Sequence, residues 1–214
     1  MTMTAGAAWL NSFFAGFDEG VVNLIHKLHD CAGDWTQPFG EFISLLGKGG
    51  IALIILSLVL LICRPTRRFG TAMCLGLAIG AVVVNLWLKV VIARPRPYAD
   101  PQSIFYPIWL AHGSHTESDF SFPSGHTNAA FAAMVPVFWL GNKRWSWLAL
   151  VFAVLMGISR IHLMVHYPSD VLCGAVTGTI AGIIGTLIAL RIPDDSRWYG
   201  WDLRKQRRKG AHEE

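Results

Sequence analysis

The sequence predicts an all-α fold, a polytopic transmembrane helical bundle of about five to six spans with an amphipathic amino-terminal helix. Two observations predict it. Of the 214 residues, 53% are hydrophobic and only 15% are charged, and the mean hydropathy of +0.43 is too high for an ordinary soluble domain. Several apolar runs also reach the ~20 residues that an α-helix needs to cross the hydrocarbon core of a bilayer.

The amino-terminal segment, residues 1–37, differs from the rest because charged residues interrupt every apolar run in it. Its large apolar residues nevertheless recur at helical spacing: Trp9, Phe13, Phe14, Phe17, Val21, Leu24, Ile25 and Leu28. This pattern favours an amphipathic helix that lies in the membrane surface, and a sixth span here is the less favoured alternative. The segment carries no signal-peptide pattern, so we expect the first span to direct its own insertion.

The transmembrane domain is expected over residues 38–192. Its spans are predicted near residues 40–63, 69–92, 123–141, 145–163 and 168–190. Pro168 and Asp170 indicate a helix start, since proline is favoured at the first helical position and aspartate in the first turn. Pro123 and Ser124 open the third span in the same way. Between the second and third spans, residues 93–122 are expected to form a loop, because prolines stop helix continuation.

Basic residues predict the orientation, because Lys and Arg accumulate in loops left on the cytoplasmic side. They follow the first, third and last predicted spans: Arg64, Arg67, Arg68, Lys143, Arg144, Arg191, Arg197, Arg204, Lys205, Arg207, Arg208 and Lys209. With five spans these places share one side, so residues 193–214 would form a basic cytoplasmic tail. The amino terminus and residues 93–122 would then face the exterior of the inner (plasma) membrane.

Three groups of polar residues lie at the ends of apolar segments on one predicted membrane face. They are Lys89 with Arg96 and Pro97, then Pro123-Ser124-Gly125-His126, then Ser159-Arg160 with His166 and Asp170. Two groups lie at helix amino termini, where free backbone N–H groups and the helix dipole favour anions. Three cations at the edge of a bilayer are costly without an anion or acidic partners. The set therefore predicts a site that binds and cleaves a phosphate ester.

These three groups resemble the three-part signature of the type-2 phosphatidic acid phosphatase superfamily, which also includes bacterial acid phosphatases, glucose-6-phosphatase and vanadium haloperoxidases. The matching residues, in the expected order, are Lys89-x6-Arg96-Pro97, Pro123-Ser124-Gly125-His126 and Ser159-Arg160-x5-His166-x3-Asp170. The match spans residues 89–170. The flanking helices are similar to those of the membrane lipid phosphatase branch of this family.

The resemblance implies a role for each matched residue. His166 would attack phosphorus and form a phosphohistidine, with Asp170 hydrogen-bonded to its far ring nitrogen. His126 would protonate the leaving oxygen and then activate water. Five residues would hold the phosphate oxygens: Lys89, Arg96, Ser124, Gly125 and Arg160. Because fixed cations stabilise the charge, no metal and no cofactor are expected.

The resemblance also implies a substrate class, a lipid phosphate or diphosphate. The short chain is similar to the small undecaprenyl-diphosphate phosphatases of the family, so undecaprenyl diphosphate is the expected substrate. Phosphatidylglycerophosphate and phosphatidic acid follow closely, and lipid A phosphate is less favoured. A membrane lipid is the only partner predicted: the net charge of +4 gives no indication of nucleic acid binding, and no obligate protein partner is expected.

Two other classes of function remain as alternatives. An anion channel or transporter is disfavoured because the ionisable residues cluster at one face and leave the last two spans without a polar stripe. A catalytically inactive binding protein is disfavoured because His126, His166 and Asp170 are all present.

Histidines outside the signature have no firm role. His162 shares a four-residue spacing with His166 and Asp170, as in a metal site, but Pro168 interrupts the helix and Arg160 disfavours a divalent ion. We therefore expect His162 to be structural or to lie at the lipid interface. His112 and His115 could contact substrate, but their polar surroundings favour simple solvation.

Lys48, in the first predicted span, could extend toward the membrane surface or meet a second phosphate, and the sequence leaves both open. Small residues form two stripes: Gly76 with Gly80, and Gly174, Gly178 with Gly182. Such stripes permit close helix approach, and packing inside one chain is the expected use.

Overall fold

The computed structural model describes residues 3–193 and 196–200, and these residues form helices and loops without any strand. The helices are α1 (Ala5–Phe13), α2 (Ala15–Ala32), α3 (Thr36–Gly47), α4 (Ile51–Ile62), α5 (Arg67–Ala81), α6 (Lys89–Ile92), α7 (Tyr106–Ala111), α8 (Gly125–Leu140), α9 (Trp147–His162), α10 (Pro168–Arg191) and α11 (Arg197–Gly200). Three 3₁₀ turns occur at Lys48–Gly50, Arg64–Thr66 and Pro97–Ala99, and a π-helix covers Val82–Leu88. The all-α fold is therefore confirmed.

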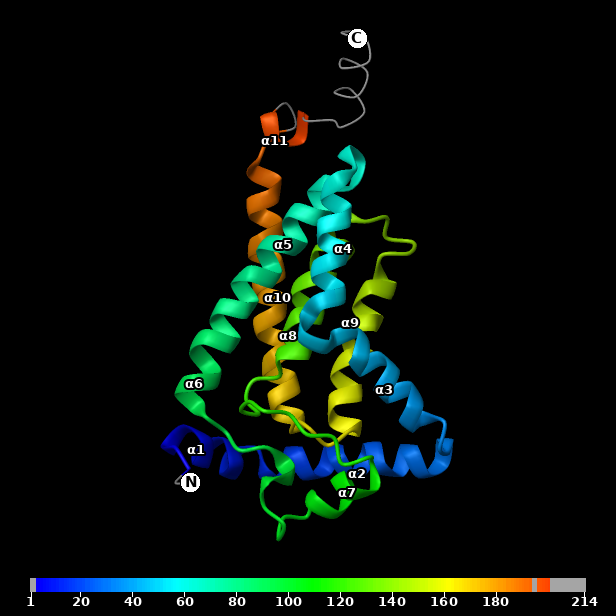
Figure 1. Cartoon of the computed structure of the whole chain (residues 1–214), viewed down its shortest axis with the longest axis vertical. Helices are drawn as coiled ribbons and strands as arrows, with labels where there is room; N and C mark the ends of the chain where they lie inside the picture. The colour runs from blue at the N-terminus through cyan, green and yellow to red at the C-terminus, as the bar shows by residue number, and fades with distance from the viewer. Residues whose placement is uncertain (1–2, 194–195, 201–214) are drawn as a thin grey trace, which may run out of the picture.

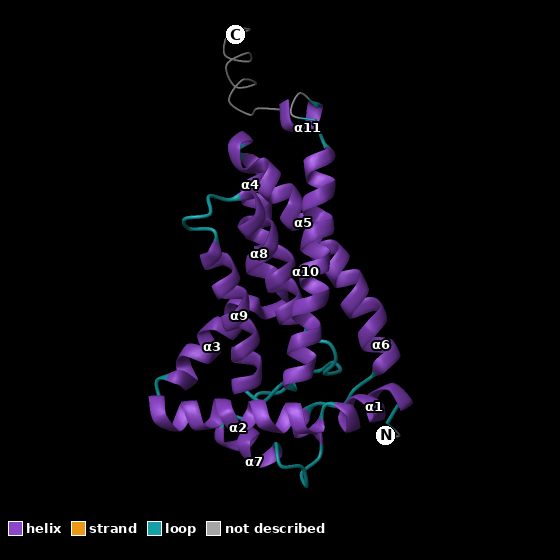
Figure 2. Cartoon of the chain, turned by 180° about the vertical axis from the view of Figure 1, so that it is seen from behind, coloured by secondary structure: helices purple, strands orange, loops and turns teal. Residues whose placement is uncertain are grey.

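A bundle of long helices stands on a layer of helices that cross one of its ends (Figures 1 and 2). Helices α4, α5, α8, α9 and α10 run along the long axis, whereas α1 and α2 lie across the lower end in Figure 1, with α7 beside them. Helix α8 lies among the others, because it contacts α5, α9 and α10. We call the end that α1 and α2 cross the closed end.

Three helical segments are long and apolar enough to cross a membrane: Thr36–Ile62, Arg64–Ala99 and Pro168–Arg191. They correspond to the first, second and last predicted spans, and the chain is a membrane protein. The spans predicted at 123–141 and 145–163 are α8 and α9, of 16 residues each. At 1.5 Å per residue such a helix is shorter than a ~30 Å hydrocarbon core. The number of spans therefore stays a prediction.

The first span is not the continuous helix that hydropathy predicted. Gly49 and Gly50 have φ values of 60° and 68°, and they separate α3 from α4. Glycine adopts this left-handed region without the steric cost that a Cβ imposes, so two glycines in succession allow the chain to turn here. Helix α3 consequently leaves the direction of α4 and slopes toward the closed end (Figure 1).

The second span contains a wide turn directly before Lys89. Residues Val82–Leu88 form the π-helix, and α6 (Lys89–Ile92) follows it and is capped by Ala93, which has a φ of 48°. Wide turns of this kind are frequent at functional sites. The prolines after Ala93 then lead the chain across the closed end, but residues 93–122 are not all loop as predicted, because Tyr106–Ala111 forms α7.

The glycine stripe of α10 permits close packing against α8. A Cβ on Gly174 would lie 2.6 Å from the carbonyl oxygen of Ser124, and one on Gly178 would lie 2.4 Å from that of Asn128. A Cβ on Gly182 would meet α8 at Val135, 3.0 Å away. The stripe therefore serves packing inside one chain, as predicted.

The large apolar residues of α2 point in two directions. Val22 is buried against Ile161 and Met164 at the end of α9, whereas Leu24 and Leu28 are 56% and 58% exposed. One face of α2 thus packs in the protein core, and another exposes large apolar side chains that an apolar environment would cover. A location in the membrane surface, with a domain boundary at residue 37, stays a prediction.

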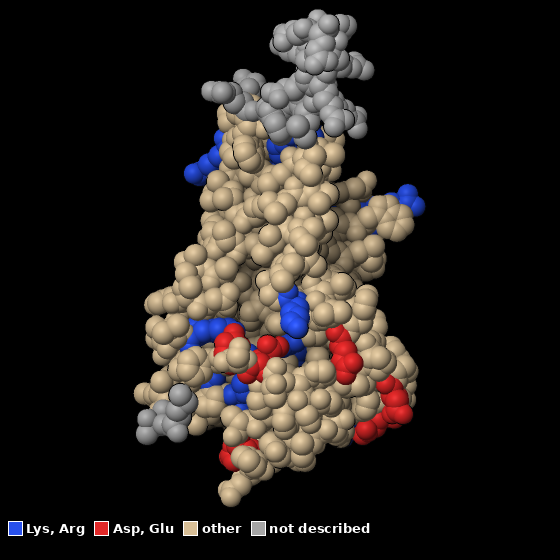
Figure 3. Space-filling view, in the orientation of Figure 1, with Lys and Arg blue, Asp and Glu red and all other residues tan. Residues whose placement is uncertain are grey.

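Charged side chains gather near the two ends, and an uncharged band separates them (Figure 3). The α4–α5 turn with Arg64, Arg67 and Arg68 lies away from the closed end, and so does the α8–α9 turn with Lys143 and Arg144 (Figure 1). This agrees with the one-sided placement of these basic residues, but which side is cytoplasmic stays a prediction. The tail residues Arg204, Lys205, Arg207, Arg208 and Lys209 lie outside the described residues.

Candidate active site

The three predicted groups of polar residues converge near the closed end of the bundle. Their ionisable members come from the start of α6, the 93–122 connection, the first turn of α8, the last turn of α9, the loop after it and the first turn of α10. Five of them are at least 93% buried: Lys89, Arg96, Arg160, His166 and Asp170. Residues as far apart in the sequence as Arg96 and His166, which are separated by 70 positions, thus lie side by side in the protein interior.

The ring of His166 is oriented by Arg96. The Nη1 atom of Arg96 lies 3.2 Å from Nε2 of His166 and also donates to the carbonyl oxygen of Val165 at 2.7 Å. A guanidinium has donors only, so its partner Nε2 must carry the lone pair and the ring proton must be on Nδ1. The nitrogen that faces the cations is therefore the one with the free lone pair.

Burial holds the pKa of His166 well below its usual range, and the nearby charges of Arg96, Arg160 and Lys89 lower this pKa further. The imidazole is neutral at neutral pH as a result. A neutral ring is what nucleophilic attack on phosphorus requires.

Asp170 lies behind His166, and a hydroxyl contacts both residues. Its Oδ2 atom is 3.7 Å from Nδ1 of His166, which is too far for the predicted direct hydrogen bond. Ser121 donates to the same Oδ2 and has its Oγ 3.5 Å from Nδ1 of His166. The backbone N–H of Tyr167 also donates to Oδ2, at 3.0 Å. Ser121 was not predicted, because nothing in its local sequence marks it.

The other oxygen of Asp170 is held by an arginine that was also not predicted. Nη1 of Arg94 lies 2.6 Å from Oδ1 of Asp170, and Nη2 lies 3.0 Å from Oδ2 of Asp18. Asp18 accepts further hydrogen bonds from the backbone N–H and hydroxyl of Ser169, at 2.7 and 2.8 Å. Burial raises the pKa of Asp18, and the bonds from Ser169 and Arg94 oppose that rise. Helix α2 is thereby fixed to the amino terminus of α10.

Two carboxylates from the loop before α8 pair with the three predicted cations. Asp119 forms ion pairs with Lys89 and Arg96, and Glu117 forms one with Arg160. The side chains of Asp119 and Glu117 are 50% and 32% exposed, so these pairs lie at the outer edge of the buried site. Although partial desolvation raises the pKa of Asp119, Lys89 and Arg96 lower it overall. A phosphate would compete with both carboxylates for the same donors.

One nitrogen of the Arg160 guanidinium has no partner. Its Nη1 donates to Ser44 and its Nη2 to Glu117, but its buried Nε has no hydrogen-bond partner among the described residues. Buried donors are almost always paired, so an unpaired N–H here indicates a place for an external acceptor. A phosphate oxygen is such an acceptor.

Helix α8 begins at Gly125 with Ser124 as its N-cap, so the predicted opening residue Pro123 lies just before the helix. The hydroxyl of Ser124 accepts hydrogen bonds from the N–H of Thr127 at 3.4 Å and from its hydroxyl at 2.9 Å. A hydroxyl has one donor besides two acceptor sites, so Ser124 can still donate to a phosphate. A Cβ on Gly125 would lie 3.7 Å from Nζ of Lys89, which places this backbone directly beside the cation.

His126 lines a cavity of about 340 Å³ between α4, α5 and α8. Its polar lining includes Asn85, Lys89, Glu117 and Asp119. The rest is apolar and comes from helices that face the membrane: Ile54, Leu77, Ala81 and Ala129. The break between α3 and α4 contributes Gly47, Gly49 and Gly50. The cavity thus joins the charged site to an apolar wall.

The residues left open by the sequence fall outside this cavity. Lys48 is exposed beside the cavity-lining Gly47 and Gly49. His115 is partly exposed, with its Nε2 3.1 Å from Oε1 of Glu41. The expected solvation of His112 is wrong: this residue is only 3% exposed, because α7 folds back against α2 and the end of α9. His162 is buried next to it.

Comparisons with known proteins show the family to which this chain belongs. Residues 69–193 match the PAP2 superfamily. The chain is 32% identical over 139 residues to the undecaprenyl-diphosphatase of Sulfolobus acidocaldarius, covering 64% of this chain and 63% of that protein. It is also 32% identical over 148 residues to the undecaprenyl-diphosphatase BcrC of Bacillus subtilis, covering 67% and 69%. The first relative is thus matched over just under two thirds of its length.

A solved structure supports the fold independently. The crystal structure of a transmembrane PAP2-type phosphatidylglycerolphosphate phosphatase from Bacillus subtilis aligns with a TM-score of 0.67 and 26% sequence identity. The alignment covers 89% of this chain and 94% of that one. The helical arrangement around the site is therefore shared over almost the whole chain.

Proposed function

Because this chain belongs to the PAP2 superfamily and to its membrane lipid phosphatases, we propose that it hydrolyses a lipid diphosphate through a phosphohistidine. The observation that carries the proposal is the convergence of Lys89, Arg96 and Arg160 on the neutral ring of His166, beside a cavity with an apolar wall. Undecaprenyl diphosphate is the favoured substrate, since two similar proteins are named for it.

In the first step, Nε2 of His166 attacks the terminal phosphorus. The P–N bond forms as the bond from phosphorus to the bridging oxygen breaks, and His126 gives that oxygen a proton. The equatorial oxygens accept hydrogen bonds from Lys89, Arg96 and Nε of Arg160, which stabilise the redistributed charge. Ser124 and the backbone at Gly125 add donors from the start of α8.

In the second step, water attacks the phosphohistidine. His126, now neutral, accepts a proton from this water, and inorganic phosphate leaves as His166 recovers its lone pair. The phosphorylated ring keeps its Nδ1 proton and is cationic, so Asp170 and the hydroxyl of Ser121 stabilise the intermediate. Arg94 keeps the carboxylate of Asp170 in place throughout.

The lipid tail would remain among the membrane lipids during the reaction. The apolar wall of the 340 Å³ cavity lies on α4, α5 and α8, so a head group can enter between helices while its chain stays outside. Lys48, exposed at the edge of the cavity, is suited to the second phosphate of a diphosphate. We further propose that the closed end faces the exterior of the inner membrane, as the basic turns at the other end indicate.

The test is phosphate release by the full chain in detergent with EDTA present. Undecaprenyl diphosphate, phosphatidylglycerophosphate and phosphatidic acid are compared side by side, and the expected kcat/KM is highest for the first. His166→Ala should lose activity by about 10³-fold or more, and a labelled phosphoenzyme should form only when His166 is present. Substantial turnover by His166→Ala would exclude the proposed nucleophile. Failure to release phosphate from all three lipids would contradict the proposed activity.

A phosphatidylglycerophosphate phosphatase is the second candidate. The observation that favours it is the solved structure described above, which matches this chain over more of its length than the two diphosphatases do. The same comparison of substrates separates the two, because this candidate requires phosphatidylglycerophosphate to have the highest kcat/KM.

A further inference from the structure

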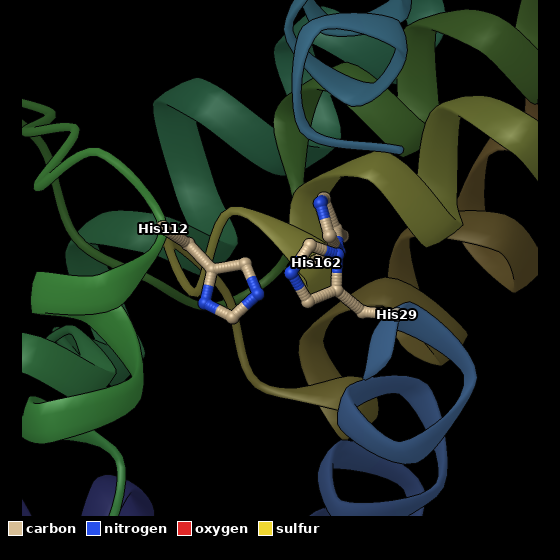
Figure 4. A group of neighbouring side chains, drawn as sticks. All are labelled: His29, His112 and His162. Carbon is tan, nitrogen blue, oxygen red and sulfur yellow. The ribbon is translucent and has the colours of Figure 1, made fainter. Parts of the chain in front are cut away.

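Three histidines outside the proposed catalytic site face one another at the closed end (Figure 4). His29 lies on α2, His112 directly follows α7, and His162 is the last residue of α9. The ring centroids are 4.9 Å apart for His29 and His112, 4.8 Å for His112 and His162, and 5.2 Å for His29 and His162. One ring nitrogen of each lies within 4.8 Å of the other two. We call these residues the histidine cluster.

Hydrogen bonds leave one nitrogen of each ring available. Nδ1 of His112 lies 2.8 Å from the carbonyl oxygen of Ile108, to which it can only donate, so Nε2 of His112 carries a lone pair. Nδ1 of His29 pairs with the hydroxyl of Thr36. Nε2 of His162 is buried without a hydrogen-bond partner among the described residues. His112 and His29 thus resemble metal-binding histidines, whose second ring nitrogen usually bonds to a carboxylate, a backbone carbonyl or water.

The nearest cation does not point at the cluster. Arg160 was expected to keep a divalent ion away from His162. Its guanidinium instead points to Ser44 and Glu117. Neutral imidazoles are good ligands for transition metals.

We propose that His29, His112 and His162 bind a transition-metal ion, with Zn²⁺ the best fit. Three imidazoles match the ligand preference of Zn²⁺, which takes a fourth ligand in a tetrahedral arrangement. Water can supply it, as can His26, whose ring centroid is 5.6 Å from that of His112 and whose buried Nδ1 has no partner in the described part of the chain. Because Zn–N bonds are about 2.0–2.1 Å long, the rings must approach one another slightly on binding.

The cluster borders a cavity and is held in place by α3. His29 is only partly buried, and it lines a cavity of about 250 Å³ together with His162. This cavity lies between α2, α3 and α9, and its other lining residues are mainly apolar. A Cβ on Gly40 of α3 would lie 2.9 Å from Cδ2 of His162, so α3 packs directly against the ring and supports its position.

A bound ion would link three segments that are far apart in the sequence. It would connect α2 and the end of α9 to residues 93–122, the connection that also carries Arg96 and Asp119. The ion would therefore have a structural role and take no part in the bond-breaking step. The proposal rests on the cluster alone, so it can fail while the proposed phosphatase activity holds, and the reverse is also true.

The test uses the full chain, purified in detergent without a polyhistidine tag and stripped with EDTA. One Co²⁺ per chain should bind and give the visible absorption of tetrahedral cobalt, and Zn²⁺ should displace it and raise the Tm. His112→Gln and His162→Gln should lose both responses. His29→Gln, at a partly exposed position, should lose them while it keeps the metal-free Tm of the wild type.

His115→Gln is the matched control, because His115 is on the same loop as His112 but outside the cluster. It should keep both the cobalt absorption and the rise in Tm with Zn²⁺. The proposal is overturned if the wild type gives neither response. It is also overturned if both responses persist in His29→Gln and His162→Gln, which would place the ion elsewhere.

Discussion

Arg94 and Asp170 form an ion pair inside the protein, with Nη1 2.6 Å from Oδ1 and side chains that are 1% and 0% exposed. The same guanidinium holds Asp18 of α2, and the ring of Tyr167 lies 3.9 Å from its Cζ atom. One arginine thus connects the amino-terminal helix to the carboxylate behind His166. The position of the proposed nucleophile depends on residues that are more than 140 positions apart.

Replacing Arg94 with methionine should destabilise the protein strongly. Two carboxylates would be left buried without their cation, and breaking a buried ion pair from one side costs about 3–5 kcal/mol. The Tm in detergent should fall accordingly. Arg64→Met, at the exposed α4–α5 turn, is the control and should change the Tm little.

The double variant Arg94→Met with Asp18→Asn tests the cause. Removing one unpaired charge should recover part of the lost Tm, since residues in one network are coupled. If the Tm changes of Arg94→Met and Asp18→Asn simply add in the double variant, the lower Tm of Arg94→Met does not come from the uncompensated carboxylate.

Ser121→Ala should lower kcat by about tenfold with little change in KM. The hydroxyl contacts both Asp170 and Nδ1 of His166, and losing one hydrogen bond of this kind costs ~1–1.5 kcal/mol. Steady-state hydrolysis of the preferred lipid measures kcat and KM of the variant. Thr116→Ala, an exposed position on the same loop, should behave as wild type. An unchanged kcat in Ser121→Ala would mean that Asp170 orients His166 without the bridge.

Asp119→Asn should strengthen inhibition by inorganic phosphate. The carboxylate competes with phosphate for Lys89 and Arg96, but it is half exposed, so the effect is the modest two- to fivefold typical of a surface pair, about 0.4–1 kcal/mol. The change is measured as the inhibition constant for phosphate. Asp100→Asn, on the exposed part of the same connection, is the control. Weaker inhibition would indicate that Asp119 helps to hold the anion.

Gly178→Ala should lower the stability by about 1–3 kcal/mol, because the new Cβ would lie 2.4 Å from the carbonyl oxygen of Asn128 and force α10 away from α8. Gly16→Ala is matched to it as a glycine within a helix, but a Cβ there has nothing within 4 Å. That variant should be neutral or more stable by up to ~1 kcal/mol. Equal Tm values for the two variants would contradict close packing at Gly178.

The stability of the protein should fall as the pH drops below about 6.5, the pKa of an unperturbed histidine. The unfolded chain takes up a proton on His166 there, whereas the folded chain does not, since burial keeps this pKa well below 6.5. The free energy of unfolding then falls by about 1.4 kcal/mol per pH unit for this group. His166→Gln should show a shallower decline in Tm between neutral and acidic pH. His112, with a lowered pKa of its own, should keep some decline in that variant. An identical pH dependence in both proteins would mean that His166 is protonated in the folded state.

The helix starts beside the site were predictable because their signals are local. Ser124 caps α8 through its own hydroxyl, and Pro168 and Asp170 start α10 within three residues. The break at Gly49 and Gly50 was missed although both glycines are visible in the sequence. Hydropathy averages over a whole span, and it does not report the sign of φ.

The residues missed around His166 depend on contacts between distant parts of the chain. Asp18 accepts a hydrogen bond from Ser169, 151 positions away, and Ser121 reaches Asp170 across 49 positions. Neither residue has a neighbour in the sequence that marks its role. Arg94 stands beside Arg96 in the same proline-rich run of the sequence. Only the fold shows that Arg96 contacts His166 whereas Arg94 pairs with Asp170.

The gathering of the reactive groups at one end of the bundle restricts which lipids the enzyme can use. A molecule inserted in one orientation reaches head groups of a single leaflet, and lipids of the opposite leaflet become substrates only after they cross the bilayer. In sealed vesicles with uniform insertion, hydrolysis should therefore halt when the accessible leaflet is exhausted, and a lipid scramblase should restart it.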